Sequence, residues 1–222
     1  MTHTTLFAPR DKEQRRDALI EAANGVFAER GYEAATTREI AERAGCAEGL
    51  IHRYFAGKRG LLLAILDHKG GHAADTYCEN VPPKDTVSEE IEAILFYELD
   101  SKWEKRDFMR VCVSEASIDP EVGHVVRESI QARQVQAIAQ RLLRHREGGR
   151  IRADVDLTAI AYVINGIGFS VGFMNRVAFA RTRKDCEQMI RQAATAIALG
   201  ISTDTHRGAA AAALSEAPAK VG

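Results

Sequence analysis

The segment GLIHRYFAGKR, residues 49–59, contains the side chains of this chain that are best suited to bind an anion. His52, Arg53 and Lys58 lie there with Tyr54, and the segment contains no acidic residue. Basic groups without neighbouring carboxylates are typical of a surface that contacts the phosphates of nucleic acid. A solvated helix surface has a similar composition, so the prediction depends on the elements that would present these side chains together.

Residues 36–55 predict two short helices joined by a tight turn. Thr36 and Glu39 form the T-x-x-E pattern of a capping box, so the first helix should begin directly after Thr36. Gly45 would end that helix in a left-handed conformation. Ile51 begins the apolar inner face of the second helix, whose outer face would carry the basic and polar residues. Two short helices joined in this way form a helix-turn-helix, in which the second helix enters the major groove of DNA.

Residues 19–65 resemble the DNA-binding domain of TetR-type transcriptional repressors. The matching features are the AA-x-x-x-F run, the GY, the TT-x-x-IA-x-x-AG, the R-YF and the lysine shortly after it. The resemblance implies an all-α fold, with an N-terminal three-helix helix-turn-helix domain joined by a long helix to a C-terminal helical ligand-binding and dimerisation domain. It also implies a homodimer that binds a near-palindromic double-stranded DNA operator and responds to a small-molecule effector.

Roles for individual residues follow from this resemblance. Thr36 and Thr37 would offer hydroxyl and backbone N–H groups to phosphate at the start of the first motif helix. Tyr54 and Lys58 match the family's phosphate-contacting positions. The remaining candidates for DNA contact are Arg38, Ala47, Glu48, Gly49, Leu50, His52 and Arg53.

Three positions depart from the family pattern. Ala47 stands where a serine commonly caps the reading helix, and such a cap contributes about 0.5–2 kcal/mol. Leu50 stands where a threonine is usual, and it could contact a thymine methyl group. His52 replaces the usual first aromatic residue. Glu48 would repel phosphate, yet it could accept a hydrogen bond from a cytosine amine. These departures leave the predicted fold unchanged but give no operator sequence.

The composition is that of a soluble protein with a packed core. Of the 222 residues 45% are hydrophobic and 27% charged, and the formal net charge is −1. Residues 1–60 hold ten Lys or Arg against nine Asp or Glu, so attraction to DNA must come from the arrangement of the charges. The four cysteines lie far apart and the N-terminus has no long apolar run. These features predict reduced thiols in a cytoplasmic protein. No cofactor is expected.

Hydrophobic periodicity predicts helices throughout the chain. Val81-Pro82-Pro83 interrupts the pattern and marks a domain boundary. The expected helices cover residues 11–30, 58–80, 86–103, 108–117, 121–146, 156–180 and 184–201, besides the two of the motif. The predicted organisation is a flexible arm (1–10), a helix-turn-helix domain (11–60), a connecting helix (61–80), a ligand-binding and dimerisation domain (81–201) and a disordered tail (202–222).

Residues 157–175 contain no charged side chain over nineteen positions, which is long enough to consider a membrane span. Asn165, three glycines and the lack of a second such segment favour a helix that is buried in an interface instead. Gly168 and Gly172, one turn apart, would let a partner helix approach closely. We therefore expect no membrane association, and a dimer in which two helices from each chain form a four-helix bundle.

Two further patterns suggest other chemistry. Residues 168–172 read GFSVG, the G-x-S-x-G pattern that in a hydrolase places the serine, here Ser170, on a sharp turn between a strand and a helix. The flanking residues have a helical pattern, so we expect no enzyme, and a serine hydrolase is the remote alternative. His68 and His72 lie one turn apart and could bind a metal with Asp75 or another helix. Two ligands do not define a metal site, so none is assigned.

The resemblance places a ligand pocket inside the second domain. Its walls would suit an apolar or aromatic small molecule better than an anion. The alternative is a constitutive DNA-binding protein, or an activator, without a ligand. The candidate pocket residues are Phe96, Trp103, Met109, Cys112, Tyr162, Asn165 and Phe169.

Overall fold

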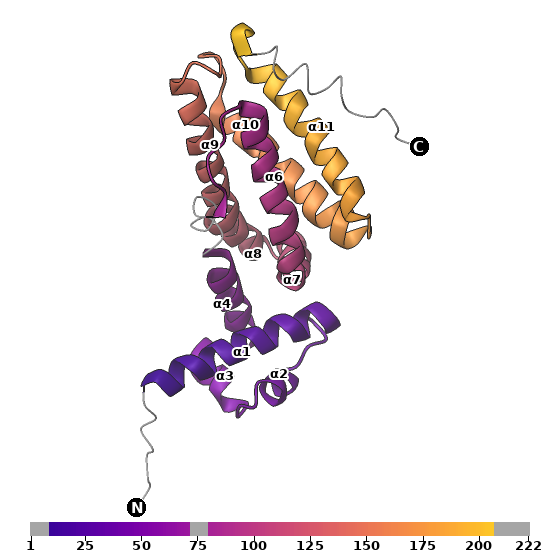
Figure 1. Ribbon diagram of the computed structural model, residues 1–222. Coiled ribbons are helices and arrows are strands. Elements are labelled where there is room, and N and C mark those ends of the chain that lie inside the picture. The colour runs from indigo at the N-terminus through magenta and orange to yellow at the C-terminus, as the bar shows by residue number, and fades with distance from the viewer. Residues whose placement is uncertain (1–8, 72–79, 207–222) are drawn as a thin grey trace, which may run out of the picture. The chain divides into compact units, whose positions relative to one another are not determined.

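The computed structural model describes residues 9–71 and 80–206, and the regular elements in these ranges are helices (Figure 1). Ile151 and Ser202 form an isolated antiparallel bridge. The all-α prediction is therefore confirmed for the described residues. The chain divides into two compact units, Met1–His72 with Asp107–Ser129, and Ala73–Arg106 with Ile130–Gly222. The sequence did not suggest that residues 107–129 belong to the same unit as the N-terminal helices.

The first unit contains the predicted helix-turn-helix. Thr36 caps α2, because its side chain accepts a hydrogen bond of 3.1 Å from the Glu39 backbone N–H. The Glu39 carboxylate lies 3.4 Å from the Arg30 guanidinium, so it pairs with α1 as well as marking the helix start. Gly31 and Gly45 have φ values of 79° and 63°, as expected of left-handed helix ends. The helices are α1 (Pro9–Arg30), α2 (Thr37–Arg43), α3 (Gly49–Phe55), α4 (Lys58–Gly71), α7 (Arg106–Ile118) and α8 (Pro120–Val125).

The turn between α3 and α4 brings two backbone segments into very close contact. Ala56 and Gly57 have φ values of 58° and 111°, which reverse the chain within a few residues. A Cβ atom built on Gly60 would lie 1.7 Å from the backbone oxygen of Phe55. Real Cβ atoms do not approach an oxygen so closely, so this position requires glycine.

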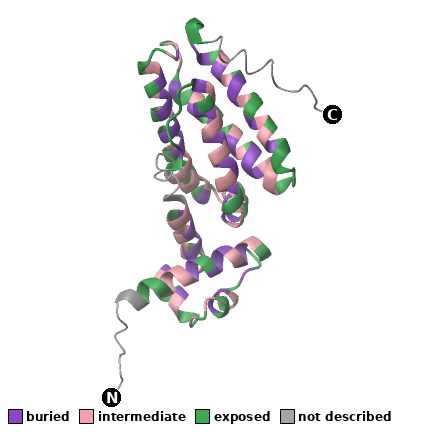
Figure 2. Cartoon of the chain, in the orientation of Figure 1, coloured by how far each residue is buried: buried purple, intermediate pink, exposed green. Residues whose placement is uncertain are grey.

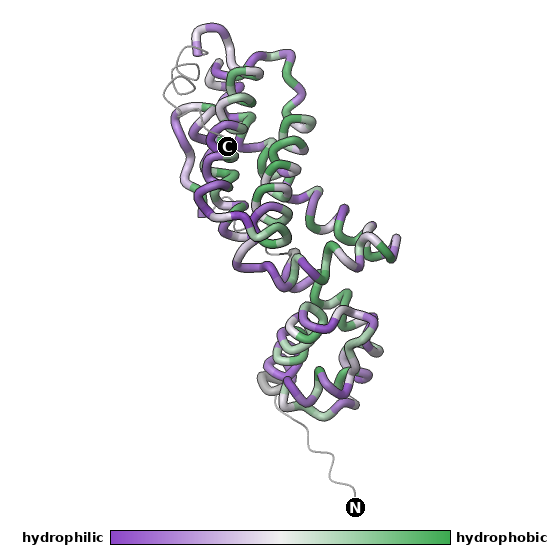
Figure 3. Tube along the Cα trace, turned by 90° about the vertical axis from the view of Figure 1, so that its right-hand side faces the viewer, coloured by the Kyte–Doolittle hydropathy of each residue, from purple (hydrophilic) through white to green (hydrophobic). Residues whose placement is uncertain are grey.

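Each unit has its own apolar core (Figure 2). In Figure 3 hydrophobic and hydrophilic residues alternate along the helices, as expected where each helix buries one side. The largest fully buried side chains of the first unit are Leu19, Ile20, Phe27, Ile40, Ile51, Leu61, Leu62, Ile65 and Leu66.

The second unit is built around α6, against which α10, the π-helix η2, α11 and α9 pack. The apolar core of this unit includes Ile91, Ile94, Leu95, Ile138, Leu142, Ile164 and Ile190. The helices are α6 (Val87–Glu104), α9 (Ala132–Glu147), α10 (Leu157–Phe169), η2 (Ser170–Ala178) and α11 (Arg183–Ile201), and the π-helix η1 (Val126–Gln131) precedes α9. The single helix predicted for residues 121–146 is thus divided into α8, η1 and α9.

The uncharged segment packs inside its own chain. Leu157–Ala178 is long and apolar enough to cross a membrane by composition, but it lies against α6, α9 and α11. A Cβ on Gly168 would lie 3.0 Å from Glu98 Cγ, and one on Gly172 would lie 3.0 Å from Lys102 Cγ. This placement corrects the prediction that Gly168 and Gly172 face a partner subunit. The close approach that the two glycines allow is made to α6.

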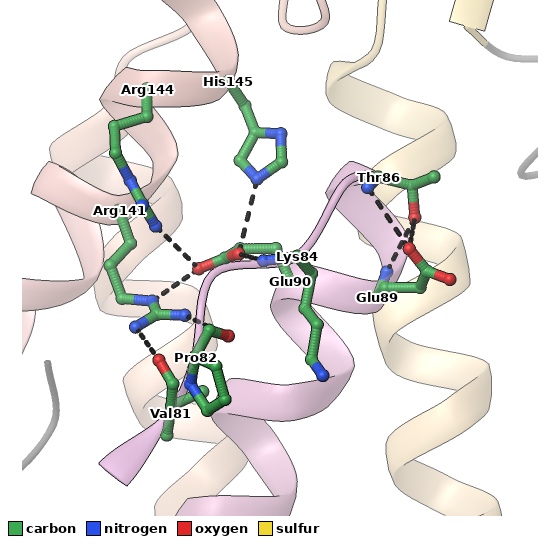
Figure 4. Close-up of polar contacts among 9 residues, drawn as sticks. All are labelled: Val81, Pro82, Lys84, Thr86, Glu89, Glu90, Arg141, Arg144 and His145. Carbon is green, nitrogen blue, oxygen red and sulfur yellow. Dashed lines mark hydrogen bonds and ion pairs between the residues drawn. The ribbon is translucent and has the colours of Figure 1, made fainter. Parts of the chain in front are cut away.

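A buried ion-pair network fixes the start of α6 against α9 (Figure 4). The Glu90 carboxylate is fully buried and accepts a 2.5 Å hydrogen bond from Arg141 Nε and a 2.8 Å bond from the Lys84 backbone N–H. Arg141 also donates to the carbonyl oxygen of Val81 at 2.5 Å. Burial alone would raise the pKa of Glu90, but hydrogen bonds from His145 and the Lys84 N–H, with the Arg141 charge, hold this pKa below its ordinary value.

Candidate nucleic-acid interface

Helix α3 presents a polar outer side and an apolar inner side. Ile51 and Phe55 are buried, whereas His52 and Arg53 are exposed and Tyr54 is half-buried. The prediction that Ile51 lies on the inner side of this helix, and His52 and Arg53 on its outer side, is therefore confirmed. The N-cap residue of this helix is Glu48 and not Ala47 as predicted, and no side-chain hydrogen bond caps the first turn. The side of α3 that carries His52 and Arg53 is therefore accessible to a partner.

The two motif helices are linked at their N-terminal ends by side chains that were predicted to contact DNA. Thr37 Oγ1 donates a 2.6 Å hydrogen bond to the Glu48 carboxylate. Its hydroxyl proton is therefore not available to phosphate in this conformation, although the backbone N–H at the start of α2 remains. Arg38 donates to Glu42 at 2.9 Å and lies on the exposed side of α2. Glu48 thus has a hydrogen-bond partner within the motif.

Lys58 has a different environment from the one predicted. Its ammonium group donates to the carbonyl oxygens of Tyr32, Glu33 and Ala35 at 2.9, 3.1 and 3.1 Å. It also lies 4.6 Å from the centre of the Tyr32 ring. An ammonium group has three N–H donors, and all three are used here to hold the loop between α1 and α2. This geometry argues against Lys58 as a direct phosphate contact. The role that it indicates for Lys58 is to hold that loop in place.

Arg59, the other cation of the acid-free segment, is also engaged within the first unit. Its guanidinium forms ion pairs with Glu121 and, at 3.4 Å, with Asp119. The hydrogen bond to Glu121 raises the pKa of Arg59 further. Distant residues of α8 therefore neutralise a charge that the local sequence left free. Arg53, by contrast, lies on the exposed side of α3.

Two basic residues of α1 lie beside α3 and were missed by the sequence reading. Lys12 Nζ lies 5.9 Å from the centre of the Tyr54 ring, and Arg16 Cζ lies 5.5 Å from that of Phe55. The sequence DKEQRR, residues 11–16, contains the pattern that could have indicated them, because Lys12 and Arg16 are one helical turn apart. A groove of about 560 Å³ separates α1 from the turn before α3. It is lined by Gln14, Arg15, Ala18, Ala44, Gly45, Cys46, Ala47 and Leu50.

The seven candidate pocket residues do not line one cavity within either unit. Met109 and Cys112 lie on α7 in the first unit, and the other five belong to the second. Asn165 is buried and donates to the Gln134 side chain at 3.1 Å, so its position is explained by core packing. Tyr162 is 47% exposed and lines an open groove of about 460 Å³ between α9 and α10.

The remaining aromatic candidates have local partners. Arg191 Cζ lies 5.2 Å from the centre of the Phe96 ring. The ring centres of Phe169 and Phe173 are 5.6 Å apart. Trp103 lies against two other arginines at the end of α6. The prediction of a single pocket lined by all seven residues is therefore not supported within the described parts of the chain.

The G-x-S-x-G pattern has no hydrolase geometry. Ser170 lies where α10 passes directly into η2, so it is inside a continuous helical segment and not on a turn between a strand and a helix. Of the proposed metal ligands only His68 is described, on α4. His72 and Asp75 lie outside the described residues.

Comparisons with known proteins agree with this architecture. Residues 19–65 match the model of bacterial regulatory proteins of the tetR family, and residues 96–201 match that of the C-terminal domain of AefR-like transcriptional repressors. The transcriptional repressor AcnR of Corynebacterium efficiens is 25% identical over 185 residues, which cover 82% of this chain and 92% of AcnR. The fatty acid metabolism regulator protein of Bacillus subtilis is 30% identical over 86 residues, 39% of this chain and 44% of the relative.

A solved structure shows the same fold. The transcriptional regulator FadR of Bacillus subtilis, in complex with stearoyl-CoA, superimposes with a TM-score of 0.71 at 21% identity, over 83% of this chain and 98% of FadR. Together the two family models include the helix-turn-helix and most of the second unit. The chain belongs to the TetR family of bacterial transcriptional regulators.

Proposed function

We propose that this protein is a transcriptional repressor that binds a near-palindromic operator as a homodimer and is released by a small, largely apolar ligand. The observation that carries the proposal is the two-sided α3, with Ile51 and Phe55 buried and His52 and Arg53 exposed. The match to repressors over both parts of the chain supports the sign of regulation. In such a dimer the two reading helices would lie about one DNA turn apart, roughly 34–36 Å.

Selection of bound duplexes from a random DNA pool tests this function and yields the operator. On the selected operator, Arg53→Ala should weaken binding by about 1–3 kcal/mol and relax the preference at one base pair, if Arg53 contacts a base edge. Fluorescence anisotropy with the operator and with single-base variants would measure both effects.

The matched control is Arg127→Ala, which removes a positive charge that lies on η1 and is already paired with Glu128 at 2.9 Å. Equal losses of affinity in the two variants would show that α3 does not read the DNA. Failure to enrich any sequence from the pool would contradict the proposed function itself.

The dimer would form through the exposed apolar sides of α10 and α11. Tyr162 and Val163 are 47% and 50% exposed. A Cβ on Gly166, also exposed, would meet no atom of this chain within 4 Å. On α11, Ala196 and Gly200 are exposed in the same manner. Small and apolar residues on exposed helix surfaces are typical of helix pairs that associate face to face.

Val163→Glu is therefore expected to raise the dimer dissociation constant by about tenfold or more, because a two-fold interface would receive two like charges. Sedimentation velocity across a concentration series measures the change. Val163→Thr is the control, since it keeps the branched shape of the side chain and adds no charge. If both variants remain dimers at wild-type concentrations, another surface mediates assembly.

The proposed ligand would act by changing the distance between the two reading helices. The major groove determines where both helices must lie, so a shift of a few ångströms lowers affinity. The stearoyl-CoA in the structure of the Bacillus subtilis regulator supports a ligand with a long apolar part. By thermodynamic linkage, operator DNA should weaken ligand binding by the same factor as the ligand weakens DNA binding, typically about 5–150-fold.

A further inference from the structure

Trp103, near the C-terminal end of α6, lies against two guanidinium groups. Arg176 Cζ on η2 is 4.2 Å from the ring centre, and Arg106 Cζ is 5.3 Å from it. All three residues belong to the second unit, whose first segment ends at Arg106, the first residue of α7. Trp103 is 41% exposed, so the cluster is open to solvent. The residues proposed to contact DNA belong to the other unit.

Backbone carbonyls hold both guanidinium groups in place. Arg106 Nη1 donates to the Trp103 carbonyl oxygen at 3.1 Å, and Arg176 Nη1 donates to the Arg181 carbonyl oxygen at 3.0 Å. Within the described ranges neither arginine forms an ion pair with a carboxylate, whereas Arg141, Arg183 and Arg191 of the same unit do. Two positive charges therefore lie beside one aromatic ring, and neither has a carboxylate within ion-pair distance in the described ranges.

Packing against the indole explains where these side chains lie but does not neutralise them. A guanidinium is attracted to an aromatic face by the ring quadrupole, yet two cations that lie beside one ring repel each other. An anion that accepts hydrogen bonds from the remaining N–H groups of both arginines would remove this repulsion. The position of Arg176 on a nine-residue π-helix adds to the case, because π-helical turns occur frequently at functional sites.

We propose that Trp103, Arg106 and Arg176 form a binding site for the phosphate group of a small ligand. The planar fork of each guanidinium matches both carboxylate and phosphate. A phosphate monoester has three acceptor oxygens and close to two negative charges at neutral pH. It can therefore satisfy both forks at once, which a carboxylate with two oxygens and one charge does less well. This assignment goes beyond the proposed function, because phosphate binding at the cluster can be measured without DNA.

The chain provides its own reporter for the test, since Trp103 is its only tryptophan. Intrinsic fluorescence would be followed while inorganic phosphate, coenzyme A and decanoate are titrated separately at constant ionic strength. We expect saturable changes with inorganic phosphate and with coenzyme A, and none with decanoate at the same concentrations. Tighter binding of coenzyme A than of phosphate would show that the site takes phosphate as part of a larger ligand. Equal affinities would show that it recognises the phosphate group alone.

Arg106→Gln and Arg176→Gln keep the reporter and should each weaken phosphate binding at least tenfold. Arg152→Gln is the matched control, because Arg152 lies in the same unit but is paired with Asp154 at 3.1 Å. Isothermal titration calorimetry would repeat the measurement independently of the fluorophore, and circular dichroism would establish that the variants are folded. The proposal is overturned if phosphate produces no saturable signal, if Arg106→Gln and Arg176→Gln bind it like the wild type, or if decanoate alone binds in an arginine-dependent manner.

Discussion

Gly60→Ala is expected to unfold the first unit at a much lower temperature and to abolish DNA binding. The new Cβ would lie 1.7 Å from the Phe55 carbonyl oxygen and 2.8 Å from its carbonyl carbon. Both are backbone atoms of the last residue of α3, so they can move only if the helix end moves. Overpacking of this kind costs about 1–3 kcal/mol or more. For a unit of this size each kcal/mol lowers the melting temperature by roughly 4–8 °C.

Differential scanning calorimetry, with anisotropy on labelled duplex DNA, measures the two effects of this substitution. Gly49→Ala is the matched control for stability, because it places the same methyl group in the same unit where a Cβ meets no atom within 4 Å. That variant should melt at or above the wild-type temperature, since alanine favours a helix by about 1 kcal/mol over glycine. A Gly60→Ala protein as stable as Gly49→Ala would disprove the close approach of α3 and α4.

Glu90→Gln is expected to destabilise the second unit by about 3–5 kcal/mol at neutral pH. The substitution keeps the shape of the side chain but removes the charge that faces Arg141, whose side chain is only 5% exposed. A buried guanidinium without a counter-ion is the cause of the loss, not the absence of one hydrogen bond. Urea denaturation followed by Trp103 fluorescence, which reports on this unit, would measure the change in the free energy of unfolding.

Two further variants separate charge from packing. Glu92→Gln breaks the ion pair between Glu92 and Arg191, whose side chains are 29% and 58% exposed respectively. This substitution should lower the free energy of unfolding by less than about 1 kcal/mol. Glu90→Leu combined with Arg141→Met should recover part of the loss, because both charges of this buried pair are then removed. Similar losses for Glu90→Gln and Glu92→Gln would mean that the buried network is not a main source of stability.

Acid should reproduce part of the effect of Glu90→Gln in the wild-type protein. The pKa of Glu90 is lower in the folded protein than the ordinary carboxylate value of 4.5. The unfolded chain therefore binds the proton first as the pH falls, and the contribution of Glu90 is complete above the ordinary value and lost as the pH passes through the lowered pKa. Glu90→Gln should lack this acid-dependent part of the stability curve, which a pH series of urea denaturations would test.

Much of the helix-turn-helix could be predicted because its determinants are local. The Thr36 cap, the left-handed Gly45 and the burial of Ile51 and Phe55 depend on residues a few positions apart. The same holds for Asp156, whose side chain caps the helix that begins at Leu157. Short-range hydrogen bonds and helical periodicity determine such features, so one sequence was sufficient for them.

The partners of individual side chains could not be predicted in the same way. Lys58 was expected to contact phosphate, but the loop more than twenty residues earlier in the chain brings three carbonyl oxygens to it. Arg59 is paired with Glu121, which is 62 positions away. Lys12 and Arg16 lie beside α3 because α1 packs against α2 and α4.

The sequence by itself determined the family, the helical class and the residues that form the outer side of α3. Only the tertiary structure decided that Gly168 and Gly172 face α6, because two small residues one turn apart permit a close helix contact without specifying which helix makes it. It likewise decided that Arg106 and Arg176 meet at Trp103, although they are seventy positions apart in the chain. Spacing within one helix determines which side chains share a side, and the packing of distant helices determines what that side contacts.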